Sequence, residues 1–246
     1  MSIDASRALA MARDCLDTEI AALQRVQSNL SDSFVQAVEL LLAAQGRVVI
    51  TGIGKSGHVA RKIAATLAST GTAAMFVHPA EASHGDLGMI TDQDVVVGIS
   101  NSGEVSELTV LLPLIKRLGV KLIAITGGLN SSLAQMADVV LDTSVEREAC
   151  PLNLAPTAST TAQMAMGDAL AMALLDARGF QAEDFARSHP GGSLGRKLLT
   201  HVKDIMRKGN DVPRVLAEAS FDDLMAAMSA KGIGAAAEVD QAARVR

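Results

Sequence analysis

The sequence contains no tryptophan and no tyrosine, and aromatic residues make up only 2% of its 246 residues. Proteins that bind single-stranded nucleic acid usually stack the bases on such side chains. The chain also lacks a surplus of positive charge, since 22 lysines and arginines stand against 27 aspartates and glutamates, a net charge of −5. A nucleic-acid-binding face requires concentrated positive charge. Both absences argue against a nucleic-acid partner.

Cysteine is equally scarce, with only Cys15 and Cys150 in the whole sequence. Their spacing fits neither a zinc site nor a disulfide framework, which favours a reducing compartment. Charged residues interrupt every apolar run in the first twenty positions, so no signal peptide is predicted. The apolar runs elsewhere are too short to span a bilayer. We therefore expect a cytoplasmic protein with no membrane partner.

What the sequence does contain is an alternation of helical patterns and short β-rich runs. Hydrophobic residues recur at three- and four-residue steps over residues 2–44, which predicts two helices that break near Ser31 and Asp32. The five predicted strands are residues 47–51, 74–78, 94–100, 121–126 and 139–142. The predicted helices that follow them are residues 56–69, a helix opening within 100–104 and ending at Leu118, 132–136 and 156–178.

Short, continuously apolar strands that alternate with helices indicate an α/β fold whose parallel sheet is covered on both faces. Right-handed crossovers make this a doubly wound, five-stranded sheet in a Rossmann-like three-layer sandwich, with ligands at the carboxyl ends of the strands. We expect this domain to span residues 1–200. Residues 201–246 read as a separate small unit, although so few residues rarely sustain a core of their own.

A glycine-rich loop follows the first predicted strand and opens a helix, residues 52–57 (GIGKSG). Its glycines match the dinucleotide fingerprint, but the second strand ends without the acidic residue that would hold a ribose. It is not a Walker A loop, because position 49 is valine. Free amides, a positive helix start and Lys55, with Ser56 beside it, suit a small phosphorylated ligand. The alternative is a tight strand–helix turn with a solvated lysine.

Two further segments are rich in hydroxyl groups. Ser100, Asn101 and Ser102 follow the strongest predicted strand, where amides and hydroxyls make an anion cradle. Ordinary capping by Ser102 is the alternative, but capping needs only one such residue. Residues 156–161 (PTASTT) form another helix start, for which capping and ligand contact are equally good explanations. Together with the glycine-rich loop, these segments predict a phosphate site.

Candidate acid–base groups lie near the same strand ends. Glu104 and Glu107 are three residues apart and would share one face of a helix. The helix dipole explains Glu104 in the first turn, which leaves Glu107 as the candidate base. His78 and His84 flank the loop after the second strand and could transfer protons or bind a metal, or simply lie on the surface.

Two more candidates come later in the chain. Glu148 lies in a long loop after the fifth strand, and His189 lies in the rigid turn SHPGG. A plain surface role explains each of them as well as a functional one does.

Several of these segments resemble a known domain. Residues 52–57, 100–104 and 157–161 resemble the SIS (sugar isomerase) domain. Three longer segments are not general features of that domain: residues 78–88 (HPAEASHGDLG), 148–156 (EACPLNLAP) and 188–195 (SHPGGSLG). With them, the sequence over residues 1–207 is similar to the arabinose 5-phosphate isomerases.

The resemblance implies interconversion of ribulose 5-phosphate and arabinose 5-phosphate (A5P), which feeds synthesis of Kdo, an acidic sugar of lipopolysaccharide. It implies a homotetramer without an organic cofactor, and a zinc ion at His78 that is inhibitory or incidental. The positions that match catalytic residues of the family are Lys55, Glu107, Glu148 and His189. The positions expected to contact the substrate are Ser56, Gly71, Thr72, His84, Ser100, Asn101, Ser102, Thr157 and Ser159.

Members of the family usually continue into two CBS modules. Residues 204–213 and 221–230 resemble the opening of the first module, and residues 238–240 could form a strand of it. We therefore expect residues 201–246 to form an incomplete CBS fragment.

Isomerisation moves one proton between adjacent carbons and another between the oxygens. We expect Glu107 to move the carbon proton, with a pKa raised toward neutral pH. Lys55 would stabilise the enediolate, His189 would open the ring or move the oxygen proton, and Glu148 would orient one of these groups. His189 could act in a neighbouring subunit's site. One alternative is a non-catalytic sugar-phosphate sensor, since SIS domains also serve as the sugar-phosphate-binding parts of regulators. The other is an isomerase of another sugar phosphate. Arabinose and ribose phosphates share one enediol, and the sequence does not show which face of it is reprotonated.

Overall fold

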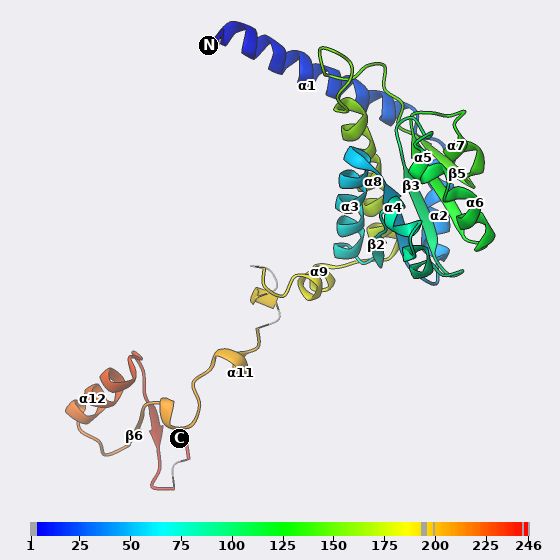
Figure 1. Cartoon of the computed structure of the whole chain (residues 1–246). Coiled ribbons are helices and arrows are strands. Elements are labelled where there is room, and N and C mark those ends of the chain that lie inside the picture. Colours follow the sequence, from blue (N-terminus) through cyan, green and yellow to red (C-terminus); the bar gives the residue numbers. More distant parts are fainter. Residues whose placement is uncertain (1–3, 193–195, 199, 243, 246) are drawn as a thin grey trace. The chain divides into compact units, whose positions relative to one another are not determined.

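All five predicted strands form one parallel sheet in the structure of the chain, a computed structural model shown in Figure 1. The structure describes residues 4–192, 196–198, 200–242 and 244–245. The described chain divides into two compact units, residues 1–189 and 190–246.

The sheet has the strand order β2-β1-β3-β4-β5. Its strands are β1 (Val48–Gly52), β2 (Ala74–Phe76), β3 (Val95–Ile99), β4 (Lys121–Thr126) and β5 (Val139–Asp142). The chain moves outward from β1 to β2 and then returns to the other side of β1 to form β3. The direction of winding therefore reverses between β1 and β3, where open parallel sheets bind their ligands.

Helices cover both faces of this sheet, as the sequence predicts. Alternate strand residues supply two cores: Val48 and Ile50 face the first, whereas Val49 faces the second. The helices that contribute to the first core are α1 (Ala5–Ser28), α2 (Asp32–Ala43), α3 (Gly54–Ser69) and α8 (Ala158–Ala177). The second core lies under α4 (Pro79–Ala82), η1 (Asp86–Met89), α5 (Ser106–Thr109), α6 (Leu112–Arg117) and α7 (Ser132–Met136).

The prediction of one helix from 100–104 to Leu118 is wrong. The chain instead forms a loop over residues 100–105, then the short helices α5 and α6. Pro113 lies in the first turn of α6, where its missing N–H is tolerated but where it ends the hydrogen-bond ladder of a longer helix.

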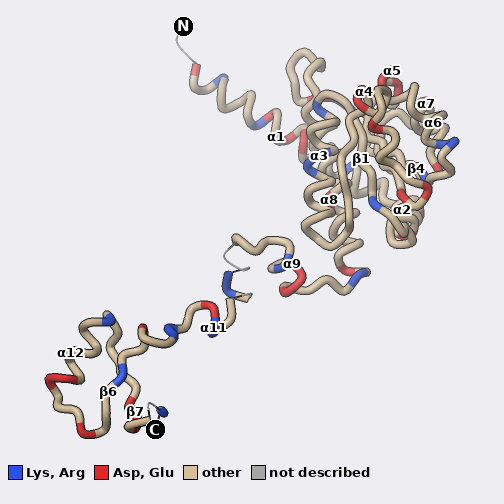
Figure 2. Tube along the Cα trace, turned by 60° about the horizontal axis from the view of Figure 1, so that its bottom comes forward, with Lys and Arg blue, Asp and Glu red and all other residues tan. Residues whose placement is uncertain are grey.

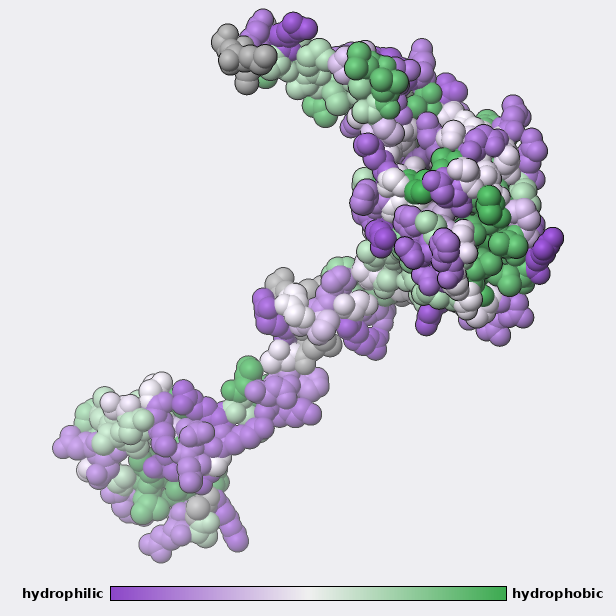
Figure 3. Space-filling view, in the orientation of Figure 1, coloured by the Kyte–Doolittle hydropathy of each residue, from purple (hydrophilic) through white to green (hydrophobic). Residues whose placement is uncertain are grey.

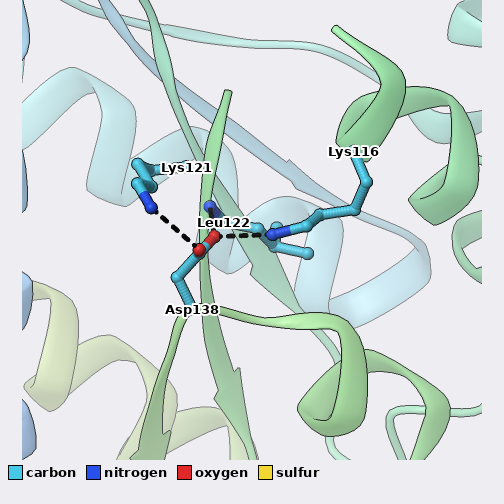
Figure 4. A network of polar contacts seen from close by, with 4 residues as sticks. All are labelled: Lys116, Lys121, Leu122 and Asp138. Atoms are coloured by element: carbon cyan, nitrogen blue, oxygen red, sulfur yellow. Dashed lines mark hydrogen bonds and ion pairs between the residues drawn. The ribbon is translucent and has the colours of Figure 1, made fainter. Parts of the chain in front are cut away.

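The amino edge of the sheet carries a polar network around Asp138, which precedes β5 (Figure 4). Its carboxylate accepts hydrogen bonds from Lys116 Nζ (2.8 Å), Lys121 Nζ (3.2 Å) and the amide of Leu122 (2.9 Å). The network joins the start of β4 to the start of β5 and the end of α6.

The helix α9 (Ala182–Ser188) ends the first unit. The second unit contains α11 (Val202–Ile205), η2 (Gly209–Asp211), β6 (Arg214–Leu216), α12 (Phe221–Lys231) and β7 (Ala237–Val239). Strands β6 and β7 pair in parallel. The predicted helix over 221–230 is α12, while the boundary at residue 200 and the CBS assignment stay predictions. Among the described residues, no helix has the length and apolarity needed to cross a membrane.

Candidate active site

A cavity of about 310 Å³ opens where the direction of winding reverses, between the carboxyl ends of β1 and β3. Its lining combines polar and apolar side chains. The lining residues are Ile53, Lys55, Ser56, Ile99, Ser100, Asn101, Ser102, Val105, Leu108 and Pro156. Five of the predicted site residues therefore meet in one place: Lys55, Ser56, Ser100, Asn101 and Ser102.

The glycine-rich loop brings Lys55 and Ser56 to this cavity by a turn that needs glycine. Gly54 has φ +58°, and a Cβ atom on Gly57 would lie 2.7 Å from the carbonyl oxygen of Gly52. The chain therefore passes directly from β1 into α3, and Lys55 and Ser56 lie in the first helical turn. Amides at such a helix start favour an anion.

Gln163 of α8 also belongs to this region, although the sequence analysis did not select it. Ser56 Oγ donates a hydrogen bond to Gln163 Oε1 (3.1 Å), and Gln163 is fully buried. Its Nε2 has no partner among the described residues. A buried amide without a partner is costly, which marks Gln163 as a functional candidate. The signal was a lone glutamine on the buried face of an alanine-rich helix.

The loop after β3 is held in shape by its own hydroxyl groups. Ser100 Oγ accepts from the amide of Gly103 (3.0 Å), and Ser102 Oγ accepts from the amide of Glu104 (3.3 Å). Gly103 has φ +69°, and a Cβ atom there would collide with Ser131. The polar cradle predicted for residues 100–102 is therefore a closed loop, not the first turn of a helix.

Glu104 does not share a helix with Glu107, contrary to the prediction, because it lies ahead of α5. Its carboxylate accepts hydrogen bonds from the amide (2.6 Å) and the hydroxyl (2.8 Å) of Ser132, at the start of α7. The bond from the Ser132 hydroxyl and then that from the amide lower the pKa of Glu104. Its role in the fold is to cap α7.

Glu107 is exposed on α5, and its Oε2 accepts a hydrogen bond from Ser106 Oγ (2.8 Å). The expectation of a raised pKa is wrong for the chain as folded here. Its own backbone amide, then the Ser106 hydroxyl and the charge of His78 hold the pKa of Glu107 below its ordinary value. Glu107 is therefore ionised at neutral pH, and His78 lies close enough to act on it.

Glu148 is anchored to the start of α8. Its Oε2 accepts hydrogen bonds from the amide (2.7 Å) and hydroxyl (3.0 Å) of Thr157 and from the amide of Ser159 (3.2 Å). Burial raises the pKa of Glu148, but the hydrogen bonds from Ser159 and Thr157 outweigh burial, so the net pKa is lowered. Among the described residues, no donor contacts Oε1, which leaves that oxygen available to another group. The Thr157 hydroxyl, predicted to contact substrate, donates to Glu148 in this chain, and its contact with substrate stays a prediction.

Two predicted residues, Gly71 and Thr72, lie at the other, amino edge of the sheet. Gly71 and Thr72 precede β2; Gly71 packs against Phe180, and Thr72 Oγ1 accepts a hydrogen bond from Arg178 Nε (3.2 Å). His189 follows α9, where its ring stacks on Phe185 at 4.0 Å. One chain thus does not bring these residues to the cavity with Lys55. Residues 193–195 of the SHPGGSLG segment lie outside the described residues.

Few side chains that could bind a metal lie near His78 among the described residues. His78 Nδ1 accepts a hydrogen bond from the amide of Ala80 (3.2 Å), and His84 is exposed between α4 and η1. Over the described ranges, no three histidine, cysteine, aspartate or glutamate side chains gather as a metal site. Zinc at His78 stays a prediction.

The chain belongs to the SIS domain family, whose model matches residues 41–173. Arabinose 5-phosphate isomerase KdsD of Pseudomonas aeruginosa is 57% identical over 237 residues, which cover 96% of this chain and 71% of that protein. The protein of the same name from Escherichia coli K12 is 56% identical over 90% of this chain and 68% of its own length. Within the SIS proteins, the chain is therefore a member of the arabinose 5-phosphate isomerase family.

A solved structure agrees with this placement. An Escherichia coli CFT073 protein in complex with A5P is 41% identical, has a TM-score of 0.74, and covers 76% of this chain with 100% of its own.

Proposed function

We propose that the chain interconverts D-ribulose 5-phosphate and D-arabinose 5-phosphate through an enediolate. The observation that carries the proposal is the cavity at the β1–β3 reversal, where Lys55, Ser56 and the 100–102 loop converge. Relatives more than 50% identical are named for this reaction, and a solved relative binds A5P.

In this proposal, the residues that line the cavity and two carboxylates from outside its lining, Glu107 and Glu148, divide the work. The helix-start amides and the hydroxyls of Ser56 and the 100–102 loop suit the phosphate, whose binding orients the sugar. The Lys55 ammonium suits the negative charge that develops on the enediolate oxygen. Glu107, ionised at neutral pH, would take the proton from the carbon beside the carbonyl and return it to the neighbouring carbon. Glu148 would orient a reacting group through Oε1.

His189, Gly71 and Thr72 complete the site from a neighbouring subunit in this proposal. In a single chain, Gly71 and Thr72 lie at the opposite edge of the sheet from Lys55, and the His189 ring lies on Phe185 of α9. An assembly of copies, a homotetramer by resemblance, would bring the two edges together. His189 would then open the sugar ring or move the oxygen proton, and His84 would lie along the substrate.

Helix α1 offers a surface for such an assembly. Leu9, Leu16 and Ile20 are more than half exposed on it, and Leu23 is exposed as well. Figure 3 shows hydrophobic residues at the surface along this helix. A groove of about 360 Å³ continues this surface between α1 and α8 and is lined mainly by apolar side chains, among them Met166. Apolar surface of this kind commonly marks contacts between copies.

The remaining parts of the proposal follow the family. The enzyme would work in the cytoplasm without an organic cofactor, zinc at His78 would be incidental or inhibitory, and A5P would feed the synthesis of Kdo and lipopolysaccharide. Residues 201–246 would be the opening of a CBS module.

The test is incubation of the purified protein with ribulose 5-phosphate in heavy water, followed by proton NMR. We expect A5P with deuterium at the carbon beside the aldehyde, because an enediolate exchanges its proton with solvent. A5P without deuterium would keep the reaction but replace the exchanging intermediate by a shielded proton or a hydride shift. Binding of the sugar phosphate without any product would make the chain a sensor, and turnover of a different sugar phosphate would replace the substrate.

A further inference from the structure

The segment that joins β5 to Glu148, residues 142–147, lies along helix α1 and contacts it through side chains. Asn29 Nδ2 donates to Asp142 Oδ2 (2.8 Å), Arg25 Nε donates to Ser144 Oγ (3.2 Å), and Arg147 Nη2 forms an ion pair with Asp14 Oδ1 (2.8 Å). Charged residues recur along this helix (Figure 2).

The order of these contacts shows how the segment runs. As the segment advances from Asp142 to Arg147, its partners retreat along α1 from Asn29 to Asp14. The fifteen helical steps between those partners span about 22 Å, whereas the five steps from Asp142 to Arg147 span at most about 18 Å. The side chains at the two ends, above all the long one of Arg147, therefore cover the remaining distance. Positions 14, 25 and 29 lie on one face of α1, because they are separated by whole helical turns.

The space between α1 and the segment is not filled by apolar packing. A cavity of about 330 Å³ lies there, lined by Asp17, Thr18, Ala21, Ala22, Arg25, Ser28, Glu146 and Arg147. Val145 packs against the first core and fixes the middle of the segment. Beyond Val145, the ion pair of Arg147 with Asp14 contacts α1 just before Glu148.

Glu148 itself is held from the other side by α8. Its carboxylate accepts from Thr157 and Ser159, its amide donates to Asn153 Oδ1 (2.7 Å), and the amide of Ala149 donates to Thr157 Oγ1 (2.8 Å). Glu148 thus sits between two anchors, one on α8 and one on α1.

We propose that Asp14 and Arg147 are positioning residues for Glu148: their ion pair fixes the position of the Glu148 carboxylate that the reaction uses. The proposal rests on the proposed function, in which Glu148 orients a reacting group. Neither residue lines the cavity that holds Lys55. Misplacement of a positioned group by about 1 Å can cost up to about a hundredfold in rate, so remote anchors of this kind matter.

The experiment compares Asp14→Asn, Arg147→Gln and the charge-swapped double variant Asp14→Arg/Arg147→Asp with Asp17→Asn. Asp17 lies on the same helix and lines the same cavity, but makes no hydrogen bond or ion pair with the described residues. We expect kcat to fall about tenfold in both single variants, with KM within about twofold, and to recover largely in the swapped pair. Asp17→Asn should match the wild type. Equal kcat in all variants would overturn the proposal.

Two further readouts distinguish a positioning role of Asp14 and Arg147 from a merely structural one. The ion pair is half exposed on both sides, so its loss should barely move the melting temperature. In a Glu148→Gln background, Arg147→Gln should lower kcat no further, because its effect passes through Glu148. The assignment would be overturned by a fall in melting temperature large enough to explain the lower kcat. It would also be overturned if Arg147→Gln lowered kcat further in the Glu148→Gln background.

Hydrogen–deuterium exchange tests the anchor without reference to catalysis. The amides of Glu148 and Ala149 should exchange faster in Arg147→Gln than in the wild type and in Asp17→Asn, because their hydrogen bonds depend on the held segment. Unchanged exchange would overturn the proposal even if kcat fell. If the wild-type protein does not isomerise ribulose 5-phosphate, the proposed function fails, whereas the exchange rates still decide whether Asp14 and Arg147 hold Glu148.

Discussion

Asp138 shows how a single carboxylate can tie the amino edge of the sheet together. Burial raises its pKa, but hydrogen bonds from Lys116, the Leu122 amide and Lys121 outweigh burial and bring the pKa to about 2. The folded pKa lies below the unfolded value of about 3.9, so the stabilisation is present above about pH 4 and is lost as the pH falls toward 2.

We therefore expect Asp138→Asn to lower the free energy of unfolding at pH 7 by about 1–2 kcal/mol, after allowance for its partly exposed partners. Urea denaturation at pH 7, 5, 4 and 3 measures this, and the difference from wild type should shrink below pH 4. Asp92→Asn is the control, since Asp92 is exposed and makes no hydrogen bond with the described residues. A difference that persists unchanged at pH 3 would contradict this account.

The carboxylate of Glu107 leads to a prediction about the pH dependence of turnover. Its pKa is lowered, so the acidic limb of kcat/KM should lie below the pKa of an ordinary glutamate rather than near neutrality. Glu107→Gln should reduce kcat at least about a hundredfold with a small change in KM, the usual size of a lost general base. Initial rates between pH 4 and 8 would test both parts. Near-normal turnover in Glu107→Gln would remove this residue from the mechanism.

At the scale of elements, α3 and α8 approach each other so closely that one position must be glycine. A Cβ atom on Gly167 of α8 would lie 2.3–2.9 Å from three carbons of Ile63, which is fully buried in α3. Alanine is the better helix former, by about 1 kcal/mol, but the side chain of Ile63 has no room to move away.

Gly167→Ala should therefore destabilise the protein by about 1–2 kcal/mol, the reverse of what helix propensity predicts. Gly88→Ala is the matched control, because nothing lies within 4 Å of a Cβ atom there. Thermal and urea unfolding of both variants would measure the effect. Equal or greater stability of Gly167→Ala would mean that the two helices can separate at little cost.

Elements with a strong hydrophobic pattern could be predicted from the sequence. All five strands lie where short apolar runs indicated them, and the helices α1, α2, α3, α8 and α12 match their periodicity. The prediction failed between residues 100 and 118, where Gly103 and Pro113 end the helical ladder while the apolar spacing continues. The same error placed Glu104 on a helix with Glu107. Its actual partner, Ser132, is 28 residues away in the chain and cannot be read from local spacing.

At the scale of the whole molecule, the apolar stripe on α1 leads to a prediction about assembly. Leu16→Glu and Ile20→Glu place charges on side chains that are 59% and 52% exposed, so the isolated chain should tolerate them. A neighbouring subunit that packs on this apolar surface of α1 should not tolerate the added charges, because they would be buried at the contact. Light scattering after size exclusion should show smaller particles, with a parallel loss of isomerase activity.

Ile205→Glu supplies the control for assembly, as it changes an exposed apolar residue of the second unit. An unchanged mass in the α1 variants would place the contact between copies elsewhere on the molecule.

The candidate site was predictable in part. Lys55 and the 100–102 loop follow strands, and parallel strands carry their carboxyl ends to one edge, so their meeting follows from the topology. Gly71 and Thr72 precede β2, so their place at the opposite, amino edge follows from the same topology. The position of His189 depends on the direction in which α8 and α9 run, which local sequence does not show. Gln163 was missed because its significance lies in burial without a partner, which only a three-dimensional arrangement reveals.

The stacking of Phe185 on His189 has a practical consequence in a chain without tryptophan or tyrosine. Phe185→Trp would place the only indole of the protein against this imidazole. Indole emission depends on the groups that contact the ring, so emission would follow the position of His189. The same emission would change when substrate or another copy of the chain draws the histidine away, and the protein would report the engagement of His189 optically.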